Sequence, residues 1–215
     1  MSVLVYGIAR DNETNVDGTG FGDAPLRAVR VDSLLAIVSD SPALRSDPET
    51  LVEYEQILER ISTHYPVVPA RFGSVLRDDD AVLEMLRTRQ QQFLAALDRI
   101  SGAVEGALSA SWGQPTLARD DGQTGSGYLS TRLEMRRRAR EVAGELTPLG
   151  KLARTSRCEL PARPAQPMRC AYLLDRDRID EFAAVVERLD RRLADVDLVC
   201  TGPWPPYSFV AGAPA

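Results

Sequence analysis

The chain has 215 residues, of which 44% are hydrophobic and 27% charged, a composition typical of globular proteins. This length suits one large domain or two small ones. The formal net charge of −5 argues against general binding to nucleic acid or to anionic membranes, although a local basic patch can still bind either. No apolar stretch approaches the roughly 18 residues of a membrane span, and the first residues lack a basic signal-peptide segment. We therefore expect a cytosolic protein.

The first half of the chain is expected to form three strands followed by two helices. The strands are expected at residues 3–9, 26–32 and 34–40, where apolar and β-branched residues cluster. Residues 48–64 carry apolar side chains at helical spacing, with Asp47 as the N-cap and proline at the first helical position. An extended segment at 65–76 follows, and one helix is expected from the acidic cluster Asp78–Asp80 to about residue 100.

The second half is predicted to run strand, helix, strand, strand, helix, strand. These elements are expected at residues 103–112, 128–146, 152–160, 168–175, 179–193 and 196–202, with Asp177 as a helix cap. This order is the ferredoxin-like βαββαβ arrangement. The predicted class is therefore α+β with two domains. An N-terminal α+β domain of unassigned topology spans 1–101, a ferredoxin-like domain spans 102–202, and an extended tail spans 203–215.

The tail carries Trp204, Tyr207 and Phe209 among three prolines. Proline excludes a helix here, and disordered segments are poor in aromatic residues. The segment is either a strap that docks on the protein's own domains or a ligand for another protein. We expect the strap, with all three aromatic side chains buried.

Residues that commonly carry catalysis are scarce. His64 is the only histidine and stands at the end of a predicted helix, where a structural role is expected. Cys158, Cys170 and Cys200 are odd in number and widely spaced, which supports neither a zinc site nor a dithiol motif. We expect buried free thiols. No catalytic, cofactor-binding or metal-binding residue is predicted.

Two glycine-rich stretches are weak candidates for phosphate binding. Residues 18–23 lack a helix directly behind them, which a dinucleotide fingerprint requires. Residues 122–127 precede a predicted helix but lack the Lys-Ser/Thr pair of a Walker A motif. We expect a flexible helix entry there.

The strongest charge run is RLEMRRRAR. Residues 132–169 contain ten basic and four acidic side chains, a net charge of +6. One interpretation is a solvated helix face that pairs with the acidic remainder of the chain, and the other is a surface for an acidic partner. Nucleic acid fits less well, because no aromatic residues alternate with the arginines. The candidate partner-binding residues are Arg132, Arg136, Arg137, Arg138 and Arg140.

Three segments resemble signature segments of the gas vesicle protein F/L family (GvpF/GvpL). They are VVPARFGSVL at 67–76, GSGYLSTR at 125–132 and GPWPPYSF at 202–209. The opening VLVYGIAR is also similar, so the resemblance covers nearly the whole chain. It implies an N-terminal α+β domain and a modified ferredoxin-like C-terminal domain.

The resemblance also implies a function. Members of this family are minor components of gas vesicles or accessory proteins of their assembly. They are taken to bind the hydrophobic, GvpA-type shell protein, and possibly other assembly proteins, and to limit aggregation of the shell protein during nucleation. The expectation is a protein without enzyme activity or a cofactor, which binds neither nucleic acid nor a membrane. The expected location is the gas vesicle and the cytoplasm. The alternative is a ligand-sensing or cofactor-binding module on a ferredoxin-like sheet.

Overall fold

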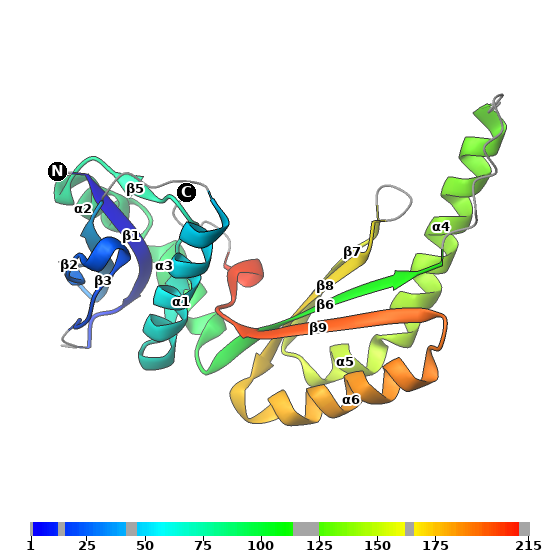
Figure 1. Cartoon of the computed structure of the whole chain (residues 1–215). Helices are drawn as coiled ribbons and strands as arrows, with labels where there is room; N and C mark the ends of the chain where they lie inside the picture. The colour runs from blue at the N-terminus through cyan, green and yellow to red at the C-terminus, as the bar shows by residue number, and fades with distance from the viewer. Residues whose placement is uncertain (1, 13–15, 42–46, 114–124, 162–165, 211–215) are drawn as a thin grey trace. The chain divides into compact units, whose positions relative to one another are not determined.

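The computed structural model describes residues 2–12, 16–41, 47–113, 125–161 and 166–210, and within them the chain has a mixed α+β fold (Figure 1). The chain divides into two compact units, Met1–Gly102 together with Pro205–Ala215, and Ala103–Trp204. The sequence predicts a separate tail from residue 203. In the structure, the final strand of the second unit includes Pro203 and Trp204, and the residues from Pro205 onward belong to the first unit.

The first unit is built on an antiparallel sheet with the strand order β2-β3-β1-β4, and a short strand, β5, also pairs with β1. The strands are β1 (Val3–Arg10), β2 (Arg27–Val31), β3 (Leu34–Asp40), β4 (Val67–Pro69) and β5 (Val75–Leu76). Seven of the eight residues of β1 are buried, so this central strand is covered on both faces. A 3-10 turn, Phe21–Asp23, precedes β2.

Helix α1 (Pro48–His64) supplies the core on one face of this sheet. The Asp47 carboxylate accepts a hydrogen bond from the Thr50 amide at 2.9 Å, which confirms the predicted N-cap. The buried Tyr54 ring stacks on Tyr6 of β1 with 5.6 Å between ring centroids. The Tyr54 hydroxyl lies within hydrogen-bonding distance of the Val5 and Ala70 carbonyl oxygens. This buried polar group is therefore satisfied by backbone acceptors.

The prediction of a single helix up to residue 100 is wrong. The structure has two helices, α2 (Asp79–Thr88) and α3 (Gln90–Ile100), separated at Arg89, whose ψ of 15° is not helical. Both helices pack against the sheet of the first unit and bury apolar faces there. The N-terminus of α2 is capped by Asp78, which accepts a hydrogen bond from the Ala81 amide.

The second unit is built on an antiparallel sheet with the order β7-β8-β6-β9. Its strands are β6 (Ala103–Trp112), β7 (Thr155–Glu159), β8 (Met168–Asp175) and β9 (Val196–Trp204). Its helices are α4 (Gly125–Glu145), α5 (Thr147–Leu152) and α6 (Ile179–Arg192). The 3-10 turn Arg176–Arg178 precedes α6, so Asp177 lies in this turn and the N-cap of α6 is Arg178.

The three helices of the second unit lie on one face of its sheet (Figure 1). Leu108 of β6 and Tyr172 of β8 point to this face, where they share a core with Val142 of α4, Leu149 of α5 and Phe182 of α6. The alternate residues of β6 and β8 point to the opposite face, which no described helix of this unit covers. On this second face Glu105 and Leu173 are buried, whereas Ala107 and Ala171 are only half-buried. We call the part of the second face around Ala107, Ala171 and Val199 the open face.

Candidate functional site

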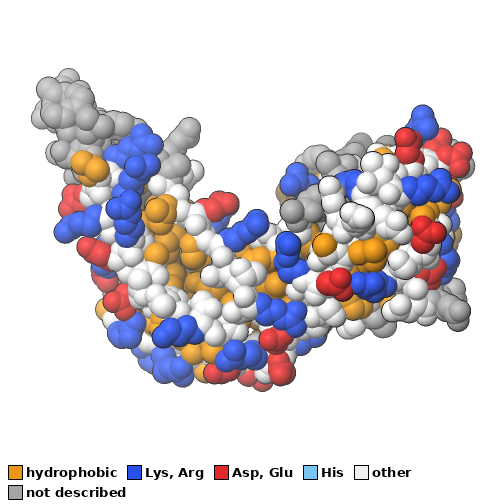
Figure 2. Space-filling model, turned by 180° about the vertical axis from the view of Figure 1, so that it is seen from behind, with side chains coloured by type: hydrophobic (Ala, Val, Ile, Leu, Met, Phe, Trp, Pro, Cys, Tyr) orange, Lys and Arg blue, Asp and Glu red, His pale blue; other side chains and the backbone are white. Residues whose placement is uncertain are grey.

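Helix α4 carries the arginine run on the side that faces away from the core. Met135, Ala139 and Val142 recur at helical spacing and are buried. Leu133, Arg136, Arg137 and Arg140 occupy the opposite side. We define the basic face of α4 as the exposed residues Leu133, Arg136, Arg137 and Arg140, which stand at i, i+3, i+4 and i+7. Figure 2 shows basic side chains gathered along this helix.

The basic face of α4 is shallow and combines charge with one apolar side chain. A depression of about 410 Å³ is lined by the face together with Glu141, and Leu133 is 67% exposed. Arg137 lies 3.9 Å from both Glu134 and Glu141, long distances for ion pairs. Among the described residues, Arg136 and Arg140 form no ion pair, and the exposed Arg132 forms none either. The face therefore has unneutralised positive charge around an exposed leucine.

Arg138 is separated from the other arginines of the run. Its guanidinium pairs with Asp195, in the turn after α6, and lies 3.3 Å from Glu141. A second pair, Arg192 to Glu145 at 2.5 Å, joins α6 to the end of α4. Arg138 thus holds α4 against its own unit. The helical spacing predicts this difference, since Arg138 stands three residues after the buried Met135 and four before the buried Val142, at the edge of the buried side.

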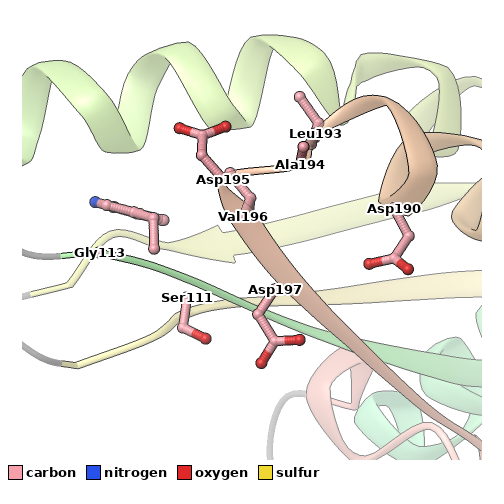
Figure 3. A pocket seen from close by; sticks show the side chains of 9 residues that line it. Ser111, Gly113, Asp190, Leu193, Ala194, Asp195, Val196 and Asp197 are labelled. Atoms are coloured by element: carbon pink, nitrogen blue, oxygen red, sulfur yellow. The ribbon is translucent and has the colours of Figure 1, made fainter.

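A larger depression of about 540 Å³ lies where β6 ends and α6 turns into β9. Figure 3 shows that its polar side chains do not converge, because Asp195 points toward the neighbouring helix while Asp197 and Ser111 point to the other side of the sheet. Within the described ranges no group of acidic, histidine or cysteine side chains could hold a metal ion. This depression therefore lacks the convergent polar groups of a ligand site.

The cysteines differ from expectation. Cys158 of β7 and Cys170 of β8 stand directly opposite each other in the sheet and form a disulfide, so they are not free thiols. Their separation of 12 residues in the chain did not suggest this pairing, which depends on the register of β7 against β8. Cys200 is the free thiol, and it is exposed on β9 rather than buried. Partial desolvation nevertheless raises the pKa of the Cys200 thiol, which disfavours the reactive thiolate.

The remaining candidates lie at the ends of elements or outside the described residues. His64 is the last residue of α1, and its side chain lies outside the described part of the structure. The stretch 18–23 leads into a 3-10 turn at Phe21–Asp23 and not into an α-helix. Residues 122–124 lie outside the described residues, and 125–127 form the start of α4.

The tail docks on the first unit through two of its three aromatic residues. Phe209 is buried, and Tyr207 packs against the core that α1 shares with its sheet. Trp204 is different, because it lies at the end of β9 with 39% of its surface exposed. Its indole Nε1 donates to the Thr201 hydroxyl at 3.2 Å. The expectation of three buried aromatic side chains is therefore wrong for Trp204.

No helix among the described residues is both long enough and apolar enough to cross a membrane.

Comparisons with known proteins agree on one family. The family model described as "Gas vesicle synthesis protein GvpL/GvpF" matches residues 2–211. Gas vesicle protein F of Streptomyces sp. (strain CB03234) is 27% identical, and the alignment covers 98% of this chain and 100% of that protein. Gas vesicle protein L of the same strain is 28% identical over 95% of this chain and 91% of its own.

The fold agrees with a solved structure. The crystal structure of the gas vesicle protein GvpF from Anabaena sp. PCC7120 superposes with a TM-score of 0.84. The superposition covers 98% of this chain and 96% of the other, at 17% sequence identity. At this level of identity the similarity shows that the two chains share a fold.

Proposed function

The chain belongs to the GvpL/GvpF family of gas vesicle synthesis proteins, and from this membership we propose that it binds the GvpA-type shell protein and limits its aggregation during nucleation. The family match over residues 2–211 supports a gas vesicle-related role, and it is the observation on which the proposal rests. A strongly apolar shell subunit self-associates unless its surface is covered until assembly. The proposed role is that of a non-enzymatic assembly protein or minor vesicle component. It acts in the cytoplasm and at the vesicle, without a cofactor, nucleic acid or membrane.

We also infer that the second unit is a modified ferredoxin-like domain. The antiparallel order β7-β8-β6-β9 and the placement of all three helices on one face support this inference. The short helix α5, between α4 and β7, is the modification.

The open face of this domain is the surface that we propose for the apolar shell protein. Ala107 of β6 and Ala171 of β8 are half-buried on this face, and Val199 of β9 is 50% exposed. β9 is an edge strand, and its residues 198–202, which precede Pro203, carry no charge. Charged side chains normally protect an edge strand from pairing with another chain, so their absence favours β-augmentation by an apolar segment.

Co-expression tests the proposal. Shell protein produced together with this chain should have a larger soluble fraction and should co-purify with it. Val199→Lys should weaken the interaction, because it places a charge on the open face. The matched control is Val75→Lys, since Val75 of β5 is 40% exposed in the first unit. Failure of the shell protein to co-purify, even with the other assembly proteins present, would contradict the function. Unchanged binding by Val199→Lys would reject only the proposed surface.

The basic face of α4, with Arg132 beside it, is a second proposed protein-docking surface. Its unneutralised arginines suit an acidic partner, whereas Arg138 positions the helix by its ion pairs. Exposed charge contacts are screened over roughly 8 Å at physiological ionic strength. Shell binding that is independent of salt would therefore indicate the open sheet face, and shell binding that salt weakens would indicate α4.

A further inference from the structure

Helix α1 of the first unit has an outer face with the opposite charge to that of α4. Tyr54, Leu58 and Ile61 turn inward and are buried. The other side of the helix is exposed and carries carboxylates around an apolar residue. We define the acidic face of α1 as the exposed residues Glu49, Val52, Glu53, Gln56 and Glu59.

The two faces match in their pattern. Each has one strongly exposed aliphatic side chain, Val52 at 56% and Leu133 at 67%. On α1, Glu49 stands one helical turn before Val52. On α4, Arg136 and Arg137 stand one helical turn after Leu133. With a rise of about 1.5 Å per residue, the acidic face is about 15 Å long and the basic face about 10 Å long. The two helices can therefore lie side by side with their charges opposed.

Other charges near the two faces reduce this complementarity only in part. Arg60 shares the outer side of α1, but its guanidinium donates to the Thr19 carbonyl oxygen at 2.5 Å and is held there. Glu134 and Glu141 flank the basic face of α4, at 3.9 Å from Arg137. Arg136 and Arg140 form no ion pair with any described residue. Opposite charge thus dominates between the two faces.

We propose that the basic face of α4 docks on the acidic face of α1 in a second copy of this chain. This inference rests on the proposal that α4 binds a protein partner, and it does not depend on binding of the shell protein. Val52 and Leu133 would contact each other at the centre, and the arginines would pair with Glu53 and Glu59 around them. A central apolar contact surrounded by polar residues is the usual arrangement of a protein interface.

The docking is head to tail, because each copy offers one basic and one acidic face. Such heterologous contacts form rings when the rotation closes and open chains when it does not. One pair of short helices buries less surface than the roughly 1,200 Å² of a stable complex, so the association is transient. It should grow with protein concentration and weaken as salt is added.

Charge reversal tests the pairing. The α4-reversed variant carries Arg136→Glu and Arg140→Glu, and the α1-reversed variant carries Glu53→Arg and Glu59→Arg. Each variant alone places like charges on both faces, so we expect its self-association to fall at least several-fold. In an equimolar mixture each face again meets one of opposite sign, and association should return. The control carries Arg188→Glu and Arg191→Glu, two exposed positions on α6, and should associate like the wild type.

Sedimentation equilibrium at low and high salt gives the readout, and circular dichroism checks that each variant folds. If a double variant does not fold, Arg140→Glu and Glu53→Arg take its place singly. A wild-type protein that stays monomeric at every concentration in low salt would overturn the proposal. So would reversals that leave association unchanged, or a mixture that fails to restore it. Loss of shell binding by the α4-reversed variant, with a monomeric wild type, would assign this face to the shell protein and leave the proposed function standing.

Discussion

The phenol of Tyr207 donates a hydrogen bond to the Glu55 carboxylate at 3.3 Å, which joins the end of the chain to helix α1 across 152 residues of sequence. A second contact ties the same segment to α3, where the Arg99 guanidinium donates to the Phe209 carbonyl oxygen at 3.1 Å. The segment after the last strand therefore holds two helices of the first unit together. The proline-aromatic sequence is a strap on this unit, with Tyr207 and Phe209 as its anchors.

The first prediction concerns which aromatic residue anchors the strap. Phe209 is 2% exposed, so Phe209→Ala empties a packed site and should cost about 3–5 kcal/mol of unfolding free energy. Trp204 is 39% exposed, and Trp204→Ala should cost about 1 kcal/mol or less. Denaturant unfolding of both variants beside the wild type gives the comparison. Equal losses in the two variants would contradict the assignment of Phe209 as the anchor.

The second prediction concerns pH. Burial raises the pKa of Glu55, the neighbouring Glu59 raises it further, and the Tyr207 hydrogen bond opposes both effects. A carboxyl with a raised pKa in the folded state binds its proton more tightly there than in the unfolded chain. Its contribution to stability is therefore complete below the unfolded pKa of about 4.3 and is lost as pH rises through the folded pKa.

Glu55→Gln should remove this loss and keep an acceptor for Tyr207. We expect the variant to gain stability relative to the wild type between acidic and neutral pH, by about 0.5 kcal/mol or less, since Glu55 is only half-buried. Urea unfolding across this range measures the difference. Gln56→Ala, an exposed change on the same helix that alters no titratable group, is the control and should show no such trend. A gain that is independent of pH would show that ionisation of Glu55 is not its cause.

Local sequence patterns were sufficient to predict those elements whose ends and buried sides depend on neighbouring residues. The N-cap Asp47 and the proline behind it marked the start of α1, and apolar spacing located its buried side. The break at Arg89 had no such signal, because neither glycine nor proline stands near it. The Arg89 guanidinium lies 4.9 Å from the Phe93 ring centroid. The different positions that α2 and α3 take on the sheet depend on packing across the whole unit. The spacing of apolar residues in the sequence does not predict this packing.

The candidate site shows the same division. Composition located the arginine run, but the run alone did not separate Arg138, which pairs with Asp195, from Arg136 and Arg140. Its partner is 57 residues away in the chain, so only the fold brings the two together. The sequence likewise did not indicate the acidic face of α1 as a candidate partner surface. Recognising it requires both the helical phase and the burial of each residue.

The third prediction concerns the disulfide between Cys158 and Cys170. It closes a loop of 12 residues and joins edge strand β7 to β8, so its loss should cost about 3 kcal/mol through the entropy of the unfolded chain. The measurement is denaturant unfolding with and without a reductant in a Cys200→Ser background, which removes the free thiol. Cys170→Ala should lose stability under both conditions, because Cys170 is also buried in the core. An unfolding free energy that does not change on reduction would contradict a stabilising role for the bond.

The fourth prediction concerns Gly202, the first residue of the segment GPWPPYSF. Its φ is +117°, a conformation that L side chains rarely adopt, and a Cβ built there would lie 2.8 Å from the Glu105 carbonyl oxygen. The pairing of β6 with β9 shifts register between Glu105 and Ala107, so the backbones approach closely where Gly202 lies.

Gly202→Ala should therefore cost about 1–3 kcal/mol, from the strained backbone and from displacement of β9 against β6. Gly113→Ala is the matched control, because a Cβ at Gly113 meets no atom within 4 Å, and it should change stability by about 0.5 kcal/mol or less. Thermal or denaturant unfolding of the two variants measures the difference. The same strand leads into Pro205 and the strap, so amide hydrogen exchange of Gly202→Ala should show weaker protection around Phe209 as well. Full stability of Gly202→Ala would mean that β9 can shift away from Glu105 without cost, and that glycine is not required where the strap begins.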